Sequence, residues 1–338
     1  MESMRKERLK QAATQIQKAN RILLACHVRP DADALGSLLG LSLGLQRLGK
    51  QVEAVSADGV PETYRFLPEW EQIRTAPEGP FDLAIGLDAD GSDRLGASEA
   101  AVLGAPVTID IDHHTGPDPF GQIQLVDPTA AATGELVFDL LAELSVTLDR
   151  EIATCLLAAI LTDTGSFRYS NVTEDTFLKA AALVAAGAHP SPIHEAVYGT
   201  RPFAASCLLG RLLNTLERSE DGRIVWGFLA QQDFRETGTT SEATEGFVDQ
   251  VRQVAGSVVA LFLREEANGE VRVSLRSRGD VNVARVAEEF DGGGHVAAAG
   301  CTLPGPLPDA VRQVREAAQR ELERFPVAPA GAAVAVSR

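Results

Sequence analysis

The chain has 338 residues, a length that predicts two domains, and its 45% hydrophobic and 23% charged residues are typical of a soluble globular protein. Its formal net charge of −16 argues against binding of long nucleic acid, because that binding depends on counterion release at basic surfaces. We expect no membrane span and no secretory signal, and four scattered cysteines without a CxxC pair predict a reducing, cytoplasmic location and no disulfide framework.

Short apolar segments alternate with helical patterns through the N-terminal half. The predicted strands cover 21–26, 51–55, 82–87 and 106–111, and the predicted helices cover 6–19, 38–45, 132–144 and 149–161. This alternation predicts a parallel sheet with helices packed against it. Because crossovers between parallel strands share one handedness, the carboxyl ends of the strands meet at one edge, which is where ligands bind in open sheets.

The turn after the first predicted strand carries a histidine and two aspartates. His27, Asp31 and Asp33 lie between this strand and an apolar helix, in the stretch HVRPDADALGS. Two carboxylates this close repel each other unless a cation lies between them, and a histidine with two carboxylates suits manganese or magnesium. The alternative is that Asp31 and Asp33 only cap the following helix.

Other polar positions also follow predicted strands and helices. Asp88 ends a strand, where a turn residue is the alternative interpretation. Asp112, His113 and His114 follow another strand. We expect the two histidines to point to opposite sides, one toward a metal and one toward a phosphate, with a purely structural pair as the alternative. Asp163 ends an apolar helix, where the helix dipole opposes its charge, so we expect a cation beside it unless it is a surface turn residue.

Together these positions provide ligands for two divalent ions. We expect Asp88, on a middle strand, to bridge the two ions at the spacing of about 3.5–4 Å that is typical of two-metal sites. Such a site activates water and stabilises the attacking and leaving oxygens, which suits phosphoester hydrolysis. The chain has neither a P-loop nor a GxSxG motif, so a kinase or a serine hydrolase has no support. The candidate ligands are His27, Asp31, Asp33, Asp88, His113 and Asp163.

The alternating pattern breaks near residue 186, and proline and small residues then indicate a linker. Asn268-Gly269 predicts a hairpin further on. The predicted strands are 223–229, 257–263 and 270–275, and the predicted helices are 241–254 and 281–290. The predicted fold is α/β, with an N-terminal parallel-sheet domain (1–188), a linker (189–204), a smaller α/β domain (205–325) and a disordered tail (326–338).

Four ordered segments resemble the motifs of the DHH phosphoesterase superfamily: HVRPDADALGS, the segment around Asp88, IDIDHHTG and ILTDTGSF. The stretch SLRSRGDVNVARVAEEFDGGGHVAAAG resembles the signature of its DHHA1 substrate domain. The resemblance covers about residues 20–303, and length and spacing are most similar to the bacterial nanoRNase and pAp-phosphatase branch. It implies two α/β domains with the active site in the cleft between them.

The resemblance also implies an activity and its cofactors. Members of this branch remove mononucleotides from very short oligonucleotides and convert 3′-phosphoadenosine 5′-phosphate (pAp) to AMP. Some members act on cyclic dinucleotides such as c-di-AMP or on the linear product pApA. The implied cofactors are two Mn²⁺ ions, with Mg²⁺ or Co²⁺ as substitutes. A homodimer without a membrane or long nucleic-acid partner is implied as well.

Each matching position receives a role from the resemblance. His114 is implied to contact the scissile phosphate, and Asp112 to orient the histidine pair, so that these two and Asp88 form the catalytic set. The implied metal ligands are His27, Asp31 and Asp88 for one ion and Asp33, Asp88, His113 and Asp163 for the other.

The implied substrate contacts in the second domain are Arg276, Ser277, Gly294 and His295. An arginine offers a planar fork to phosphate oxygens, and a glycine run lets backbone N–H groups approach a phosphate. Asp291 departs from the family, which often has glycine there, and places a negative charge near the implied phosphate pocket. We interpret Arg278 and Arg285 as solvated charges.

Three other functions are alternatives to the nucleotide hydrolase. An inorganic pyrophosphatase with a DHH domain would carry a motif with more closely spaced basic residues, such as SRKKQ, whereas this chain has SLRSR, ending at Arg278. A processive exonuclease of the RecJ type would carry further nucleic-acid-binding modules and basic grooves. A non-catalytic nucleotide sensor would have lost ligands, whereas all expected ligands are present.

Overall fold

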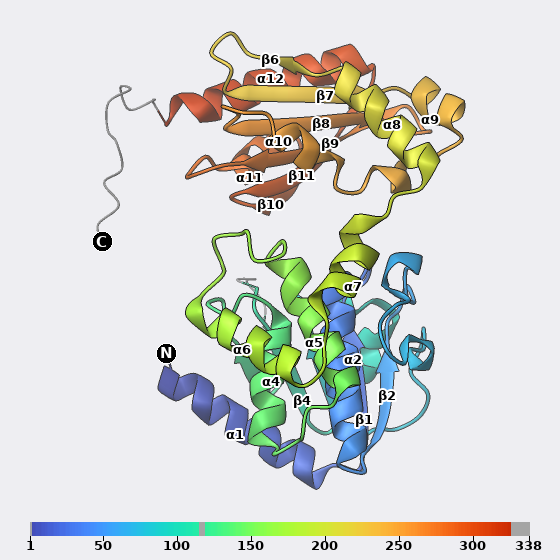
Figure 1. The fold of residues 1–338 in the computed structure, drawn as a ribbon, viewed down its shortest axis with the longest axis vertical. Coiled ribbons are helices and arrows are strands. Elements are labelled where there is room, and N and C mark those ends of the chain that lie inside the picture. Colours follow the sequence, from blue (N-terminus) through green and yellow to red (C-terminus); the bar gives the residue numbers. More distant parts are fainter. Residues whose placement is uncertain (1, 115–118, 326–338) are drawn as a thin grey trace. The chain divides into compact units, whose positions relative to one another are not determined.

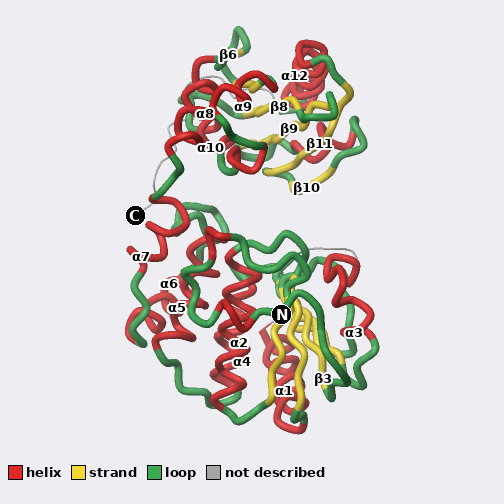
Figure 2. The backbone as a smooth tube through the Cα atoms, turned by 90° about the vertical axis from the view of Figure 1, so that its right-hand side faces the viewer, coloured by secondary structure: helices red, strands yellow, loops and turns green. Residues whose placement is uncertain are grey.

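The structure, a computed structural model, describes residues 2–114 and 119–325 (Figures 1 and 2). The chain divides into two compact units, the first ending at Thr200 and the second beginning at Arg201, and each is described by itself. The predicted tail, 326–338, lies outside the described residues. Among the described helices, none combines the length and the apolar character needed to cross a membrane.

The first unit is built on a five-stranded parallel sheet with strand order β2-β1-β3-β4-β5. This confirms the predicted parallel α/β architecture. The fifth strand was not predicted, because its four residues are too short for a clear alternating pattern. The strands are β1 (Arg21–Cys26), β2 (Gln51–Val55), β3 (Leu83–Leu87), β4 (Thr108–Asp112) and β5 (Ile123–Val126).

Helices pack on both faces of this sheet. Figure 2 shows α2, α4 and α5 on one side of the strands and α3 on the other, and the buried residues form one core on each side. The predicted linker contains α7 and the π-helical turn Glu195–Gly199. The helices are α1 (Glu2–Lys18), α2 (Ala32–Arg47), α3 (Glu99–Leu103), α4 (Thr133–Glu143), α5 (Arg150–Asp163), α6 (Glu174–Ala185) and α7 (Pro190–His194), with 3₁₀ turns at Glu62–Tyr64, Trp70–Gln72 and Ser92–Ser98.

Helices α2 and α5 approach each other closely because glycines line α2 where they meet. A Cβ atom on Gly36 would lie 2.4 Å from the carbonyl oxygen of Cys155, and one on Gly40 would lie 2.6 Å from Leu156. Helix α5 is buried along most of its length, as expected for a helix that is apolar nearly all round. This packing fixes the N-terminus of α2 and the C-terminus of α5, which both carry predicted ligands.

The second unit contains a six-stranded sheet with order β10-β11-β9-β8-β7-β6, in which only β7 and β8 pair in parallel. Helices α11 and α12 pack on one face, and α8 and α10 on the other (Figure 2). The strands are β6 (Glu217–Arg218), β7 (Ile224–Leu229), β8 (Val259–Glu265), β9 (Glu270–Ser277), β10 (Gly293–His295) and β11 (Ala298–Pro304). The helices are α8 (Phe203–Asn214), α9 (Gln231–Thr237), α10 (Phe247–Arg252), α11 (Val283–Glu288) and α12 (Leu307–Glu323).

One helix prediction in this unit is wrong. Residues 241–254 do not form a single helix but a 3₁₀ turn, Ser241–Thr244, followed by the shorter α10. Gly246 separates the two with φ of +73°, a left-handed conformation that glycine adopts without steric cost and that ends a right-handed helix. Gly293 and Gly294, the last two residues of the glycine run, form the edge strand β10 together with His295.

Candidate metal centre

Seven side chains from four parts of the first unit converge at the carboxyl edge of its sheet. They form three groups of three residues, and within each group the donor atoms all lie within 4.8 Å of one another. Asp88 and His113 each belong to two groups, so the groups overlap. Within the described residues, the groups are His27-Asp31-Asp88, Asp33-His113-Asp163 and Asp88-His113-His114.

His27 follows β1 and has a fixed ring orientation. Its Nδ1 lies 2.8 Å from the carbonyl oxygen of Val28, which can only accept, so Nδ1 carries the proton. Its Nε2 then faces the carboxylates, 3.6 Å from Asp88 and 3.9 Å from Asp31. The nitrogen with the available lone pair is therefore the one that faces both aspartates.

Asp31 and Asp33 open helix α2. The Asp31 carboxylate accepts from the N–H groups of Asp33 and Ala34, both at 3.0 Å, so the capping interpretation holds for Asp31. Asp33 is 1% exposed, and its carboxylate accepts from the N–H groups of Thr133 at 2.8 Å and Gly134 at 3.0 Å. The cap uses only one oxygen of Asp31, so capping and metal binding are compatible.

Asp88 lies in the middle of the cluster, directly after β3. Its φ of +59° is unusual for a residue with a side chain and places it on a tight turn, a strain that is typical of functional positions. It is 2% exposed, and the hydroxyl of Thr133 donates to its Oδ1 at 2.9 Å. The Nε2 of His113 lies 3.7 Å from the same oxygen. The structure thus brings Asp88 between the two predicted ligand sets.

His113 and His114 do not point to opposite sides, as the alternation of a strand would require. Their ring centroids are 4.6 Å apart, and both rings lie within 3.7 Å of Asp88. The expectation fails because β4 ends at Asp112 and the chain turns there. Asp112 accepts from the N–H groups of both histidines and contacts His114 Nδ1 at 2.7 Å, which holds the turn.

His113 and Asp163 meet on the other side of the cluster. The Nδ1 of His113 is 3.3 Å from the carbonyl oxygen of Ala130, which directs Nε2 toward three carboxylates. The nearest of these belongs to Asp163, at 3.3 Å, and Asp33 follows at 3.7 Å. Asp163 is the last residue of α5, where the Asn171 amide donates to its backbone carbonyl. A ring held by a carbonyl on one nitrogen is typical of metal-ligating histidine.

The charges of the cluster are not balanced by the chain alone. Burial, together with the charge of Asp88, raises the pKa of Asp33 well above its usual value and that of Asp163 to about 8. Burial would also raise the pKa of Asp88, but the surrounding histidines lower it to about 2. Although burial opposes it, contact with Asp112 raises the pKa of His114 to about 10. A cation beside these carboxylates would offset the repulsion and the cost of burial, and would favour their charged forms.

The donor set fits divalent metal ions. The distances from histidine Nε2 to carboxylate oxygen run from 3.3 to 3.9 Å. Hydrogen bonds of this type are shorter, at about 2.7–3.2 Å. Two ligand atoms on one ion, each about 2.1 Å from it, are separated by about 3–3.5 Å. Mixed imidazole and carboxylate donors are the set that manganese, iron and zinc accept.

The sequence did not identify three residues that support the cluster. Thr133 and Gly134 bind Asp33 and Asp88 through the N-terminus of α4, and Asp33 is 100 residues away from Thr133 in the chain. Arg94 packs its guanidinium 3.3 Å from Nδ1 of His27, and because both groups are donors when Nδ1 is protonated, this contact is packing and not a hydrogen bond. Only the predicted start of a helix near 132 could have pointed to Thr133, since helix N-termini attract anionic groups.

The predicted substrate residues of the second unit lie at its free sheet edge and on β9. Arg276 donates to the backbone of Leu275, and its Nε is 3.9 Å from Asp249. Ser277 is 2% exposed, and its hydroxyl donates to the carbonyl oxygen of Val281 at 2.6 Å. This hydroxyl therefore fixes the end of β9. Gly294 and His295 form part of the exposed strand β10.

Comparison with known proteins matches both halves of the chain. The model of the DHH family, N-terminal domain, matches residues 21–160, and the model of the DHHA1 domain matches residues 210–324. The bifunctional oligoribonuclease and PAP phosphatase NrnA of Thermus thermophilus is 40% identical over 309 residues, covering 90% of each chain. The protein of the same name from Bacillus subtilis is 30% identical over 83% of this chain and 89% of the relative. An exopolyphosphatase-related protein from Bacteroides fragilis has a similar fold, with a TM-score of 0.87, 26% identity, and coverage of 93% of this chain and 96% of that chain.

Proposed function

Because the chain belongs to the DHH family and carries a DHHA1 domain, we propose that it is a metal-dependent phosphoesterase. In this proposal it releases mononucleotides from very short oligonucleotides and converts pAp to AMP. The names of the relatives from Thermus thermophilus and Bacillus subtilis support the substrate class. The observation that carries the proposal is the convergence of three overlapping donor groups around the buried Asp88.

The two ions would be held by the two sides of the cluster. Two divalent ions bound there would supply a nucleophile from water at neutral pH and stabilise charge on the attacking and leaving oxygens. Manganese suits the mixture of imidazole and carboxylate donors, and Mg²⁺ or Co²⁺ are the expected substitutes. The ligands would be His27, Asp31 and Asp88 on one side and Asp33, Asp88, His113 and Asp163 on the other.

The protein's own groups hold and polarise the substrate. Although burial opposes it, the contact with Asp112 raises the pKa of His114 to about 10, and a protonated His114 ring would stabilise negative charge on the scissile phosphate. Asp112 acts through His114 and keeps its ring in place. Both roles need only a phosphate that reaches the exposed side of the His114 ring.

The second unit would hold the rest of the nucleotide. Arg276 would bind a phosphate through its guanidinium and His295 through a ring nitrogen, and Gly294 lies beside His295 on the exposed edge strand. Ser277 would act as a positioning residue, because its buried hydroxyl fixes the loop behind Arg276. This proposal requires both units to contact one substrate, and it further expects a homodimer, which sedimentation analysis would test.

A panel of substrates with manganese tests the proposal. The panel contains pAp, a dinucleotide, a 5-mer, a 24-mer and cyclic di-AMP, and product release is followed for each. We expect turnover of pAp and of the short oligonucleotides. Turnover of cyclic di-AMP alone would assign the protein to a cyclic-dinucleotide phosphodiesterase, the second candidate. Tight binding of nucleotide without turnover of any substrate would instead indicate a sensor.

A further inference from the structure

One face of the second sheet is covered by helices only in part. On β7 and β8 this face carries apolar residues such as Val225 and Phe262, which pack under α8 and α10. Among the described residues, β9 and β11 contribute no member to that core, and their larger apolar side chains, such as Val273 and Leu303, belong to the core under α11 and α12. The outward face of β9 and β11 is therefore made of polar and small residues.

The register of the strands arranges this surface in rows. Residues paired across antiparallel strands point to the same face, and each row is two residues from the next. Predicted substrate residues occupy one end of the surface, and Arg272 occupies the other. The rows are His295-Ala298-Arg276, Gly293-Gly300-Ser274 and Thr302-Arg272.

The side chain of Arg272 is exposed and makes no ion pair or hydrogen bond within the described parts of the chain. It lines a cavity of about 300 Å³ together with residues 290–292 and 300–302. Between Arg272 and Arg276 the surface carries only Ser274 and the small residues of β11. The two arginines are four residue positions apart along β9, which corresponds to about 13 Å between their Cα atoms. A flexible chain with repeated negative charges can lie along this surface.

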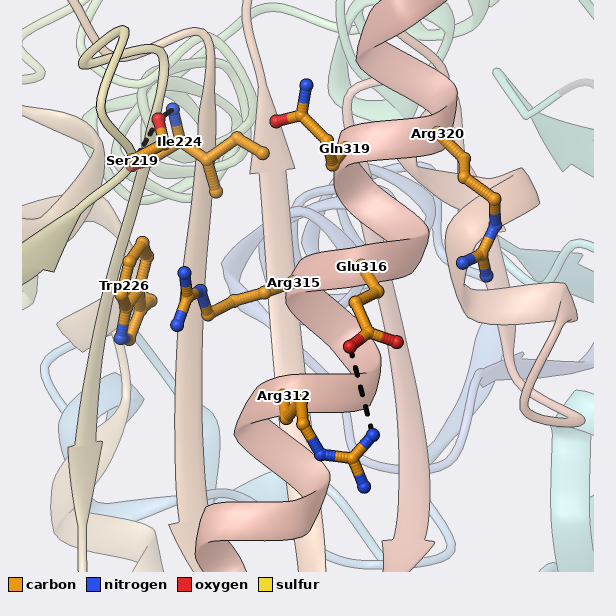
Figure 3. Close-up of a pocket in the computed structure, with 8 residues that line it drawn as sticks. All are labelled: Ser219, Ile224, Trp226, Arg312, Arg315, Glu316, Gln319 and Arg320. Carbon is orange, nitrogen blue, oxygen red and sulfur yellow. Dashed lines mark hydrogen bonds and ion pairs between the residues drawn. The ribbon is translucent and has the colours of Figure 1, made fainter.

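Several other arginines of the second unit already have partners. A cavity of about 420 Å³ between β7 and α12 is lined by three of them (Figure 3). Arg312 lies 3.8 Å from Glu316, Arg320 pairs with Glu289, and Arg315 stacks 3.7 Å from the ring centre of Trp226. The charge of these arginines is compensated or covered, so this cavity is a poorer phosphate site than the one at Arg272.

We propose that Arg272 forms a further phosphate subsite, through which the second unit contacts an additional phosphate of an oligonucleotide. The proposal rests on the proposed function, in which Arg276 and His295 hold the phosphate next to the scissile one. A guanidinium group binds phosphate oxygens through two parallel hydrogen bonds, and Arg272 presents it on the same face as Arg276. The small residues between them leave room for the sugar-phosphate backbone.

The number of phosphates on the substrate determines whether it can reach this subsite. pAp has two phosphates, one of which is hydrolysed and one of which can reach Arg276. An oligonucleotide with three or more phosphates has a further one for Arg272. Arg272 therefore affects longer substrates and leaves pAp unaffected.

Asp291, which departs from the family pattern, lies in the same cavity. It is exposed, and its φ of +55° places it in the left-handed region that asparagine also adopts readily. Its carboxylate repels a phosphate at Arg272 and so weakens this subsite. Asp291→Asn removes the charge and keeps the backbone conformation.

The test compares Arg272→Gln, Asp291→Asn and the control Arg312→Gln, an exposed arginine on the opposite face. KM is measured with manganese for pAp and for a 5′-phosphorylated pentanucleotide, over a series of salt concentrations. For the pentanucleotide, Arg272→Gln should raise KM about tenfold, the scale of one lost charge-assisted contact, and reduce the slope of log(kcat/KM) against log salt by about 0.7. Asp291→Asn should lower KM for the pentanucleotide. Both variants should keep the wild-type KM for pAp, and Arg312→Gln should match the wild type throughout.

The outcomes separate the subsite from the proposed function. If the wild-type protein hydrolyses both substrates but Arg272→Gln keeps the wild-type KM for the pentanucleotide, the subsite is wrong and the proposed function stands. An equal rise in KM for pAp and pentanucleotide also overturns the subsite. If the wild-type protein hydrolyses neither substrate, the proposed function fails, and the subsite fails with it.

Discussion

At the scale of single residues, Asp88 is the centre of the candidate site. It is buried, it lies on a turn with positive φ, and it is within 3.7 Å of ring nitrogens from three histidines. A hydroxyl from α4 holds one of its oxygens. A carboxylate placed this way can serve both halves of the cluster, whereas every other aspartate in the cluster lies on one side of it.

Replacing Asp88 with asparagine should therefore abolish most of the activity. The amide keeps the shape but loses the charge that both ions would share. We expect turnover of pAp to fall at least about 100-fold, the scale for losing a principal electrostatic group. The matched control is Asp93→Asn, an exposed aspartate of the following turn, which should keep wild-type turnover. Near-normal turnover in a folded Asp88→Asn protein would place the bridge elsewhere.

Removing metal should also lower stability, because the cluster concentrates carboxylates in a buried place. Ions that bind only the folded state stabilise it by about 2.7 kcal/mol when present at 100 times their Kd. We expect chelation to lower the melting temperature and abolish product release, and added manganese to restore both. The measurement is thermal unfolding of one sample before chelation, after chelation and after manganese addition. An unchanged melting temperature together with full activity after chelation would argue against a metal site.

At the scale of elements, helix α5 links the core to the site. Its middle packs against the glycines of α2, and its last residue is Asp163. Its first turn depends on Asp149, whose carboxylate accepts from the N–H groups of Glu151 and Ile152 at 3.0 Å. Arg47 of α2 contacts the same carboxylate at 2.9 Å. The cap therefore sets both the start of α5 and its pairing with α2.

Asp149→Ala should lower the free energy of unfolding by about 1 kcal/mol at pH 7, the usual cost of losing an N-cap. Although burial opposes it, the N–H group of Ile152 and the charge of Arg47 lower the pKa of Asp149. A carboxylate with a lowered pKa in the folded state stabilises the fold above its unfolded pKa of about 3.9, and this contribution is lost as the pH falls through the folded value.

The difference in free energy of unfolding between wild type and Asp149→Ala should thus become smaller below about pH 3–4. Urea unfolding at pH 7 and at pH 3 measures it. Asp149→Asn, which keeps a capping oxygen, is the control and should retain most of the stability at pH 7. A difference that stays constant with pH would mean that the charge of Asp149 contributes nothing.

At the scale of the whole molecule, the net charge of −16 opposes polyanions. A short substrate places its few phosphates at the positive groups of the site, whereas each further phosphate of a long strand lies against an acidic surface. Long-range repulsion of this kind is strongest at low ionic strength. We therefore expect the chain to act on small nucleotides in preference to long nucleic acid.

We expect hydrolysis to be fastest for dinucleotides to about 5-mers and weak for 24-mers, because repulsion grows with each phosphate outside the site. Rates on a 3-mer, a 5-mer and a 24-mer at equal concentration and low salt provide the measurement. Higher salt should reduce the difference in rate between the short oligonucleotides and the 24-mer, because it screens the repulsion. Equal rates on the 3-mer and the 24-mer at low salt would contradict the prediction.

The sequence by itself determined the parallel α/β domain, its strands β1 to β4 and the order of the polar turns that follow them, because hydrophobic periodicity and turn residues are local signals. It also placed the candidate ligands at strand and helix ends. The tertiary structure decided what local signals cannot contain. It brings the N-terminus of α4 to Asp33 and Asp88, and it turns His113 and His114 to the same cluster. It also pairs β9, β11 and β10 so that Arg272, Arg276 and His295 share one face. These arrangements join residues far apart in the chain, and their register is set by packing and hydrogen bonding between strands and not by the sequence around each residue.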